Sequence, residues 1–219
     1  MSAALIAALR ALLPEELALA ASDPSAEATG LWPAEATAMA RAVPARRREF
    51  AAGRRAARMA LASLGHAPAP IPMTPDRAPL WPEGLTGTIS HGAGLCLALV
   101  GWSRDWAGLG LDLEPAMPLP EDILATICTL AERRALAQDP SGLLSRRLFC
   151  AKEATYKAQY TQSRRLLSFH DLEVSFDAAG GFIAQLQPPC PPFSPATRFA
   201  GHLVQANGIL AALVALPRL

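Results

Sequence analysis

The sequence has no excess of charge of either sign. Its 219 residues include 20 Lys and Arg against 19 Asp and Glu, which leaves a formal net charge of +1. Proteins that bind nucleic acid or an anionic membrane surface through electrostatic attraction present a strongly basic field. The charge balance therefore argues against nucleic acid as a partner and against stable membrane association.

Long apolar runs are also missing, although 51% of the residues are hydrophobic. Two uncharged stretches, 84–103 and 199–217, approach the length of a membrane span. Gly, Ser and His interrupt the first, and His202, Gln205 and Asn207 interrupt the second. A spanning helix needs about 20 consecutive, predominantly apolar residues. No basic leader precedes the N-terminal hydrophobic residues, so we expect a cytoplasmic protein with a hydrophobic core.

Paired cysteines are absent as well. The four cysteines, Cys96, Cys128, Cys150 and Cys190, do not have the short paired spacing of zinc or redox sites. We expect ordinary buried thiols, as in a protein of the reducing cytoplasm.

Hydrophobic periodicity and turn residues predict an alternation of helices and strands. We expect turns at 91–94 and at Asn207-Gly208, a strong two-residue hairpin signal. The predicted helices are 2–13, 45–64, 121–130, 131–138 and 143–160; the predicted strands are 17–21, 86–90, 95–102, 107–114, 172–176, 182–186, 198–206 and 209–216.

Two carboxylates lie on one face of the predicted strand 107–114. Its three leucines point to the core, whereas Gly110, Asp112 and Glu114 point the other way. At roughly 3.3 Å per residue the two acids are about 6.6 Å apart along the strand. Both can then reach one hard cation, and Gly110 is expected to leave room for a ligand to approach the backbone.

The predicted helix 143–160 carries a third carboxylate. Glu153 and Lys157 are four residues apart, so they share a helix face, and Lys152 precedes Glu153. Alone, Glu153 and Lys157 would form a surface ion pair. Together with the two strand acids, Glu153 would complete an oxygen site for Mg²⁺, and the lysines would bind phosphate charge. The combination predicts metal-assisted phosphoryl chemistry.

Segments 110–114 and 149–157 resemble the two signature motifs of the 4′-phosphopantetheinyl transferases. These motifs read G-x-D-x-E and F/W-[S/C/A]-x-K-E-[A/S]-x-x-K. Segments 48–58, 77–82 and 88–91 resemble the enterobactin-synthetase branch of the surfactin-type transferases. The resemblance extends over about residues 46–176, and the order of all five motifs makes it specific.

The resemblance implies an α+β fold built from a pseudo-twofold pair of similar halves. Residues 1–103 would contact the phosphate and adenine groups of coenzyme A. Residues 104–219 would contain the metal site and the catalytic helix, with the active site in the cleft between the halves. A monomer is implied.

The implied activity is transfer of the 4′-phosphopantetheine arm of coenzyme A to a serine of an apo-carrier protein, with release of adenosine 3′,5′-bisphosphate. Mg²⁺, or alternatively Mn²⁺, would be held by Asp112, Glu114 and Glu153. Glu153 and Lys157 would be catalytic; a metal-bound water is the alternative base. The carriers would belong to nonribosomal peptide, polyketide or fatty-acid synthases, and the branch suggests siderophore biosynthesis.

The resemblance also implies contacts to coenzyme A. In the predicted helix 45–64, several arginines lie opposite the apolar face, either as phosphate ligands or as a solvated basic face. Lys152 would likewise bind phosphate or face solvent. The implied contact residues are Arg47, Arg54, Arg77, Ser90, His91, Asp112, Lys152 and Lys157.

Two rival functions remain at this point. One is a coenzyme A-binding module without transferase activity; the other is a metal-dependent nuclease, against which the balanced charge argues. A further hypothesis concerns 161–169, where Arg164 and Arg165 would steer an acidic carrier toward the site. Its alternative places Leu166, Leu167 and Phe169 under the sheet, with both arginines merely solvated.

Overall fold

The structure is a computed structural model that describes residues 2–218, and the chain divides into two compact units. Unit 1 comprises the described residues up to Ala107 together with 217 and 218; unit 2 comprises Gly108–Leu216. No helix within residues 2–218 is both long and apolar enough to cross a membrane. The expected assignment of ligand contacts to 1–103 and of the metal site to 104–219 stays a prediction.

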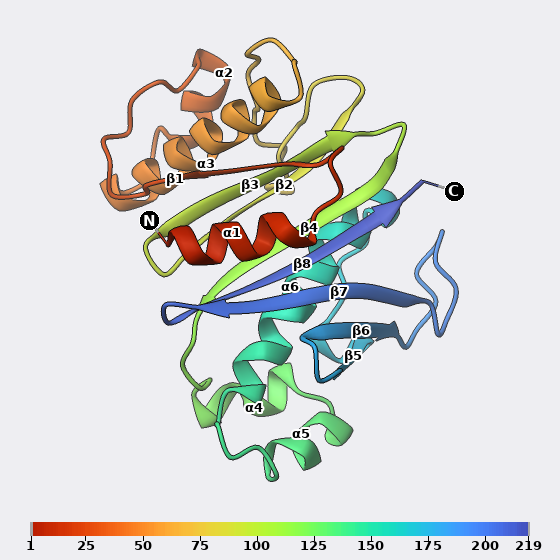
Figure 1. Cartoon of the computed structure of the whole chain (residues 1–219). Helices are drawn as coiled ribbons and strands as arrows, with labels where there is room; N and C mark the ends of the chain where they lie inside the picture. The colour runs from red at the N-terminus through yellow and green to blue at the C-terminus, as the bar shows by residue number, and fades with distance from the viewer. Residues whose placement is uncertain (1, 219) are drawn as a thin grey trace. The chain divides into compact units, whose positions relative to one another are not determined.

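Unit 1 packs one long helix, α3, against a three-stranded antiparallel sheet of order β1-β3-β2 (Figure 1). Pro44 begins α3, and Gly65 follows it with φ 74°, the left-handed conformation that ends helices. The buried face of α3 consists mainly of alanines, which bring the helix close to the sheet. The elements are α1 (Ala3–Leu12), β1 (Ala18–Ser22), α2 (Pro33–Ala36), the 3-10 helix η1 (Thr37–Met39), α3 (Pro44–Ser63), β2 (Leu85–Gly92) and β3 (Leu95–Trp102).

The hairpin between β2 and β3 is tighter than expected. Only Ala93 and Gly94 form the turn, both with positive φ (49° and 74°), as a two-residue hairpin of type I′ requires. His91 pairs with Cys96 and Gly92 with Leu95, so both belong to β2 and not to the turn. The expectation of a four-residue turn at 91–94 is therefore wrong.

Unit 2 places α6 against a five-stranded sheet of order β4-β8-β7-β6-β5 (Figure 1). Leu148, Ala151, Ala154 and Ala158 of α6 belong to its hydrophobic core. The elements are β4 (Trp106–Pro115), α4 (Glu121–Ile127), α5 (Leu130–Leu136), α6 (Leu144–Ser163), the 3-10 helix η2 (Phe169–Asp171), β5 (Leu172–Phe176), β6 (Gly181–Leu186), β7 (Arg198–Ala206) and β8 (Ile209–Pro217).

Most of the predicted elements are confirmed, and so is the α+β class. The hairpin at Asn207-Gly208 has φ 51° and 75°. The four cysteines are buried free thiols, and burial raises the pKa of Cys96 to about 12. The break between α4 and α5 lies at Cys128-Thr129, not after residue 130, because Thr129 caps α5 in a capping box with Glu132.

Two glycines of β4 allow α6 to lie directly on the strand backbone. A Cβ atom on Gly110 would be 1.8 Å from the Ala154 carbonyl oxygen, and one on Gly108 would be 2.2 Å from that of Ala158. The space beside Gly110 is thus filled by the helix. The expectation that Gly110 leaves room for a ligand is wrong.

We predict that Gly110→Ala lowers the free energy of unfolding by about 3 kcal/mol or more, because a backbone carbonyl must move away. Urea denaturation measures this change. Gly208→Ala is the control, because a Cβ atom there would have no atom within 4 Å and only the positive φ of 75° opposes a side chain. This variant should lower the free energy of unfolding by about 1 kcal/mol. Equal losses in the two variants would mean that α6 can shift from β4 at little cost.

Candidate active site

Asp112 and Lys157 form an ion pair between β4 and α6. The Lys157 Nζ donates to Asp112 Oδ1 at 2.7 Å and to the Leu111 carbonyl at 3.0 Å. Asp112 is only 6% exposed. Burial opposes the charged form of Lys157, but the neighbouring carboxylates of Asp112 and Glu153 outweigh it and raise its pKa. Lys157 is therefore a fixed, protonated cation at neutral pH.

Glu114, two residues further along β4, pairs with Arg146 of α6. The Arg146 Nη1 donates to Glu114 Oε2 at 2.6 Å, and its Nε donates to the Met117 carbonyl at 3.0 Å. Burial and then the charge of Asp112 raise the pKa of Glu114, and Arg146 offsets part of that rise. No sequence signal had pointed to Arg146, since the pair depends on how α6 meets β4.

Glu153 lies one turn of α6 before Lys157 and is partly buried. Burial raises its pKa; the Lys157 charge works against this, and the charges of Asp112 and Glu114 add to it. Lys157, which pairs with Asp112, lies one turn from Glu153 on α6, so the helix of Glu153 packs beside the strand that carries the other two predicted carboxylates.

The donor chemistry of these three carboxylates fits a hard divalent cation, which prefers oxygen ligands. Within residues 2–218 no three His, Cys, Asp or Glu side chains stand in a ready metal-binding geometry. Two of the carboxylates are held by Lys157 and Arg146 instead. The acids thus match Mg²⁺ in type and in neighbourhood, while the precise ligand arrangement stays a prediction.

A pocket of about 330 Å³ opens beside Glu153. Its wall is largely apolar, and Glu153 is its one acidic lining residue. Leu166 is 79% exposed, whereas Leu167 and Phe169 pack partly against the core of unit 2. The alternative that these three apolar side chains pack into the protein therefore holds for Leu167 and Phe169 but not for Leu166. The lining residues are Lys152, Glu153, Tyr156, Leu166, Leu167, Ser168, Phe169 and Leu172.

Lys152 neither faces solvent nor is available to phosphate. It is 1% exposed, and its Nζ donates to Glu132 Oε2 at 2.7 Å and to the carbonyls of Ile127 (2.8 Å) and Phe169 (2.9 Å). An ammonium group has three donors, and all three are used. Both expectations for Lys152 are wrong, because its partner Glu132, which sequence reasoning missed, is buried beside it.

Arg54 also lies inside the protein, so it fits neither of its two expected roles, as a phosphate ligand of coenzyme A or as part of a solvated basic face. It is 6% exposed, its Nε donates to the Ile71 carbonyl at 2.8 Å, and its guanidinium lies 3.8 Å from the Phe50 ring centroid. Burial lowers the pKa of Arg54 to about 10, which leaves it charged at neutral pH. Arg58 is likewise bound to the buried Glu35 at 2.7 Å.

Arg47 and Arg77 remain exposed. The Arg47 Nη2 donates to the Ala40 carbonyl at 2.6 Å. Arg77 has φ 68°, a conformation uncommon outside glycine, in a tight turn that the Thr74 N–H closes on the Ala78 carbonyl. The turn presents Arg77 to solvent.

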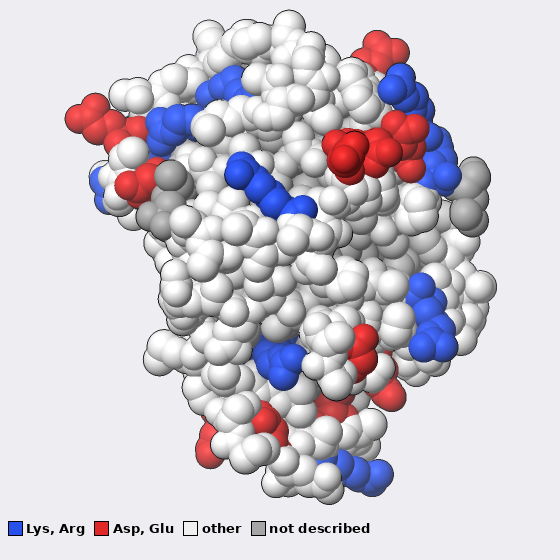
Figure 2. All heavy atoms as spheres, in the orientation of Figure 1, with Lys and Arg blue, Asp and Glu red and all other residues white. Residues whose placement is uncertain are grey.

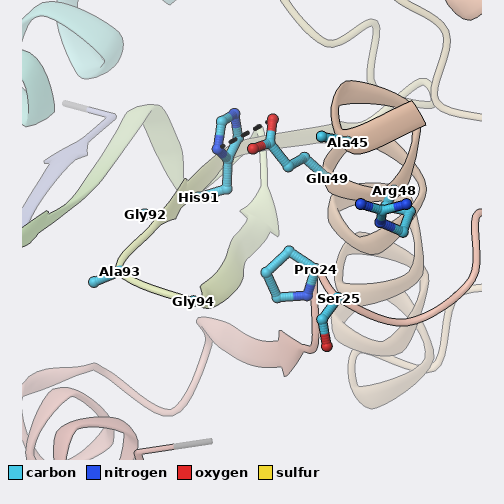
Figure 3. A pocket seen from close by; sticks show the side chains of 9 residues that line it. All are labelled: Pro24, Ser25, Ala45, Arg48, Glu49, His91, Gly92, Ala93 and Gly94. Atoms are coloured by element: carbon cyan, nitrogen blue, oxygen red, sulfur yellow. Dashed lines mark ion pairs between the residues drawn. The ribbon is translucent and has the colours of Figure 1, made fainter. Parts of the chain in front are cut away.

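His91 lies beside a second pocket, of about 290 Å³, within unit 1. Figure 3 shows its ring turned toward Glu49 of α3, with 3.8 Å between Nδ1 and Oε2. The Arg46 Nη1 lies 2.6 Å from His91 Nε2. Ser90 is buried, and consecutive strand residues point to opposite faces. The structure thus leaves His91 accessible and does not bring Ser90 to the same surface.

Charged side chains do not gather by sign on the face shown in Figure 2. Lys and Arg are interspersed with Asp and Glu among many uncharged residues. This distribution agrees with the net charge of +1. On that face there is no continuous basic groove of the kind that tracks a nucleic-acid backbone.

Two family models match the chain. The 4′-phosphopantetheinyl transferase N-terminal domain matches residues 34–101, and the 4′-phosphopantetheinyl transferase superfamily matches residues 108–206. The latter match contains the three carboxylates and Lys157.

Curated relatives agree with these matches. The 4′-phosphopantetheinyl transferase Npt of Nocardia iowensis is 40% identical over 68% of this chain and 68% of its own. The transferase Svp of Streptomyces mobaraensis is 42% identical over 74% of this chain and 68% of its own. Enterobactin synthase component D of Salmonella typhimurium is 38% identical over 52% and 48%, in agreement with the resemblance seen in the sequence.

The raised pKa of Glu153 predicts a pH-dependent cost in stability. Its folded pKa lies above its unfolded value, so the wild type loses stability relative to Glu153→Gln as pH rises through the interval between the two values. In urea denaturation with a chelator present, Glu153→Gln should be the more stable protein at neutral pH, and the gain should vanish in acid. The exposed Glu121→Gln serves as control. A gain that is independent of pH would contradict the assignment.

Proposed function

The chain belongs to the 4′-phosphopantetheinyl transferase superfamily, and from this premise we propose that it transfers the 4′-phosphopantetheine arm of coenzyme A to a serine of an apo-carrier protein. The observation that carries the proposal is the Lys157–Asp112 ion pair, which joins α6, the helix of Glu153, to β4, the strand of Asp112 and Glu114. These residues occupy the signature positions of the family motifs.

In the proposed reaction the serine oxygen forms a bond to the phosphorus that bears the pantetheine arm. The bond from that phosphorus to the bridging oxygen breaks, and adenosine 3′,5′-bisphosphate leaves with the electron pair. Asp112, Glu114 and Glu153 would hold Mg²⁺, which when bound neutralises pyrophosphate charge and aligns the attack. Lys157, held as a cation by Asp112, would stabilise the negative charge that grows on the leaving phosphate.

Glu153 would accept the proton of the serine hydroxyl through one water. Burial raises the pKa of Glu153 in the metal-free protein. Once Glu153 holds the metal it is a poor base itself, so a metal-bound water would relay the proton. The place of Glu153 at the rim of a pocket leaves it accessible to a substrate. Neither Asp112 nor Glu114 lines that pocket, which favours Glu153 for this role.

The pocket beside Glu153 would receive the pantetheine arm. The arm is joined to the reacting phosphorus, so it must extend from the neighbourhood of the carboxylates. A largely apolar pocket of about 330 Å³ lies there, walled by Leu167 and Phe169. Such a wall suits an elongated, mostly apolar chain with few polar groups.

The accessible basic groups of unit 1 would bind the nucleotide end of coenzyme A. His91, Arg47 and Arg77 are exposed and lie within the matched N-terminal domain, whereas Arg54 would support the fold. Carrier proteins of nonribosomal peptide, polyketide or fatty-acid synthases are the proposed partners. The enterobactin synthase relative adds a siderophore pathway as a candidate.

Incubation with coenzyme A, Mg²⁺ and an apo-carrier should increase the mass of the carrier by one phosphopantetheine arm. Asp112→Asn, which keeps an oxygen for Lys157, should reduce kcat/KM at least ~100-fold through loss of charge stabilisation. Glu121→Asn is the control. Binding of coenzyme A without any mass gain across a panel of carriers would favour a binding module, and cleavage of nucleic acid would favour the nuclease alternative.

His91→Ala should weaken binding of coenzyme A roughly tenfold more than binding of 3′-dephospho-coenzyme A, because only the former carries the 3′-phosphate that His91 is proposed to bind. Calorimetric titration of both ligands measures the difference. As control, His202→Ala, at an exposed histidine, should change the affinity for neither ligand. Equal losses for both ligands would remove His91 from the 3′-phosphate.

Reversal of the charges of Arg164 and Arg165 should raise the KM for the carrier about tenfold at low salt, and less at high salt. Both side chains are exposed after the end of α6, next to the exposed Leu166. Arg133→Glu/Arg134→Glu on α5 makes the same charge change in unit 2 and should have a smaller effect. An unchanged KM at low ionic strength would place the docking surface elsewhere.

A further inference from the structure

A buried ion pair joins five segments of unit 2 beside the proposed active site. Lys152 of α6 binds Glu132 of α5 and the carbonyl oxygens of Ile127, at the end of α4, and of Phe169, in η2. Glu132 Oε1 accepts the Val174 N–H of β5 at 2.9 Å. The side chain of Lys152 is 1% exposed and that of Glu132 is 3% exposed.

Stability alone is a poor explanation for such a pair. Removing two charges from water costs several kcal/mol per ion, and well-packed apolar side chains often serve as well or better. What a fully hydrogen-bonded pair adds is fixed geometry, because each bond constrains the direction of its partner.

The pair lies at the wall of the pocket beside Glu153, with Lys152 in the wall and Glu132 outside the lining. Lys152 and Phe169 both line that pocket, and the bond from Nζ to the Phe169 carbonyl is 2.9 Å long. The Phe169 ring packs against Phe149 of α6, with 5.5 Å between the ring centroids. Between the end of α6 and η2, residues 164–168 form no helix or strand, so the Phe169 anchor holds a segment with little regular structure of its own.

We propose that Glu132 and Lys152 are positioning residues that hold the 166–169 wall against α6 and thereby set the affinity of the pocket for the pantetheine arm. The inference rests on the proposed function, since it takes the arm as the occupant. Neither charged group needs to touch the substrate: Lys152 acts through the Phe169 backbone, and Glu132 acts through Lys152.

The test compares two ligands that differ in the arm. Coenzyme A carries it, whereas adenosine 3′,5′-bisphosphate retains the nucleotide and lacks it. In the double variant Glu132→Gln/Lys152→Met, which removes both charges and keeps similar volumes, the Kd for coenzyme A should rise roughly tenfold because the wall must be ordered on binding. The Kd for the bisphosphate should stay as in the wild type. Hydrogen exchange should increase in residues 166–172 more than in α3.

The matched control is the buried ion pair of unit 1, Glu35 with Arg58, at 2.7 Å. Glu35→Gln/Arg58→Met should change the Kd values of both ligands by the same factor, because both ligands contain the same nucleotide. The ratio of the two Kd values should then stay as in the wild type. If the double variant of unit 2 does not fold, Glu132→Asp, which keeps the buried charge pair but shortens its reach to Lys152 and Val174, provides the same comparison.

An unchanged ratio of the two Kd values in a folded unit 2 variant overturns the inference, whether both Kd values stay as they were or both rise by the same factor. Failure of the proposed function would look different: the wild type itself would then transfer no arm to any carrier. Transfer by the wild type with an unchanged ratio in the variant removes only the positioning role.

Discussion

The close contact of helix α6 with strand β4 determines where every other group of the site can lie. The carbonyls of Ala154 and Ala158 occupy the positions that side chains on Gly110 and Gly108 would fill. Because the helix lies on the strand backbone, Lys157 reaches both Asp112 and the Leu111 carbonyl. Two glycines of β4, of which Gly110 belongs to the first motif, thus set the position of Lys157 in the second motif.

Charge is balanced locally within this contact. Asp112 is held by Lys157 and Glu114 by Arg146, while Glu153 remains beside the pocket with a raised pKa. A cluster of buried carboxylates would otherwise repel one another and favour protonation. The site therefore combines acids that suit a divalent ion with a cation that suits phosphate, the combination that phosphoryl transfer requires.

Lys152 and Lys157 show how far residue identity can mislead. They lie five positions apart on one helix, which at 3.6 residues per turn separates them by about 140° around the axis. Lys157 faces β4 and the proposed site. Lys152 faces Glu132 and two backbone carbonyls in the interior. A motif that contains both lysines gives no indication of this difference, because the partner of Lys152 lies on another helix.

The sequence alone determined the local features: the positions of α3 and α6, the alternation of β4, the hairpin at Asn207-Gly208, and the motifs that carry the three acids. These follow from periodicity and turn chemistry, which act over a few residues. Only the tertiary structure decided that Arg54 and Lys152 are buried and that a helix fills the space beside Gly110. Burial and ion pairing depend on contacts between segments distant in the chain, and no local pattern records which segments will meet.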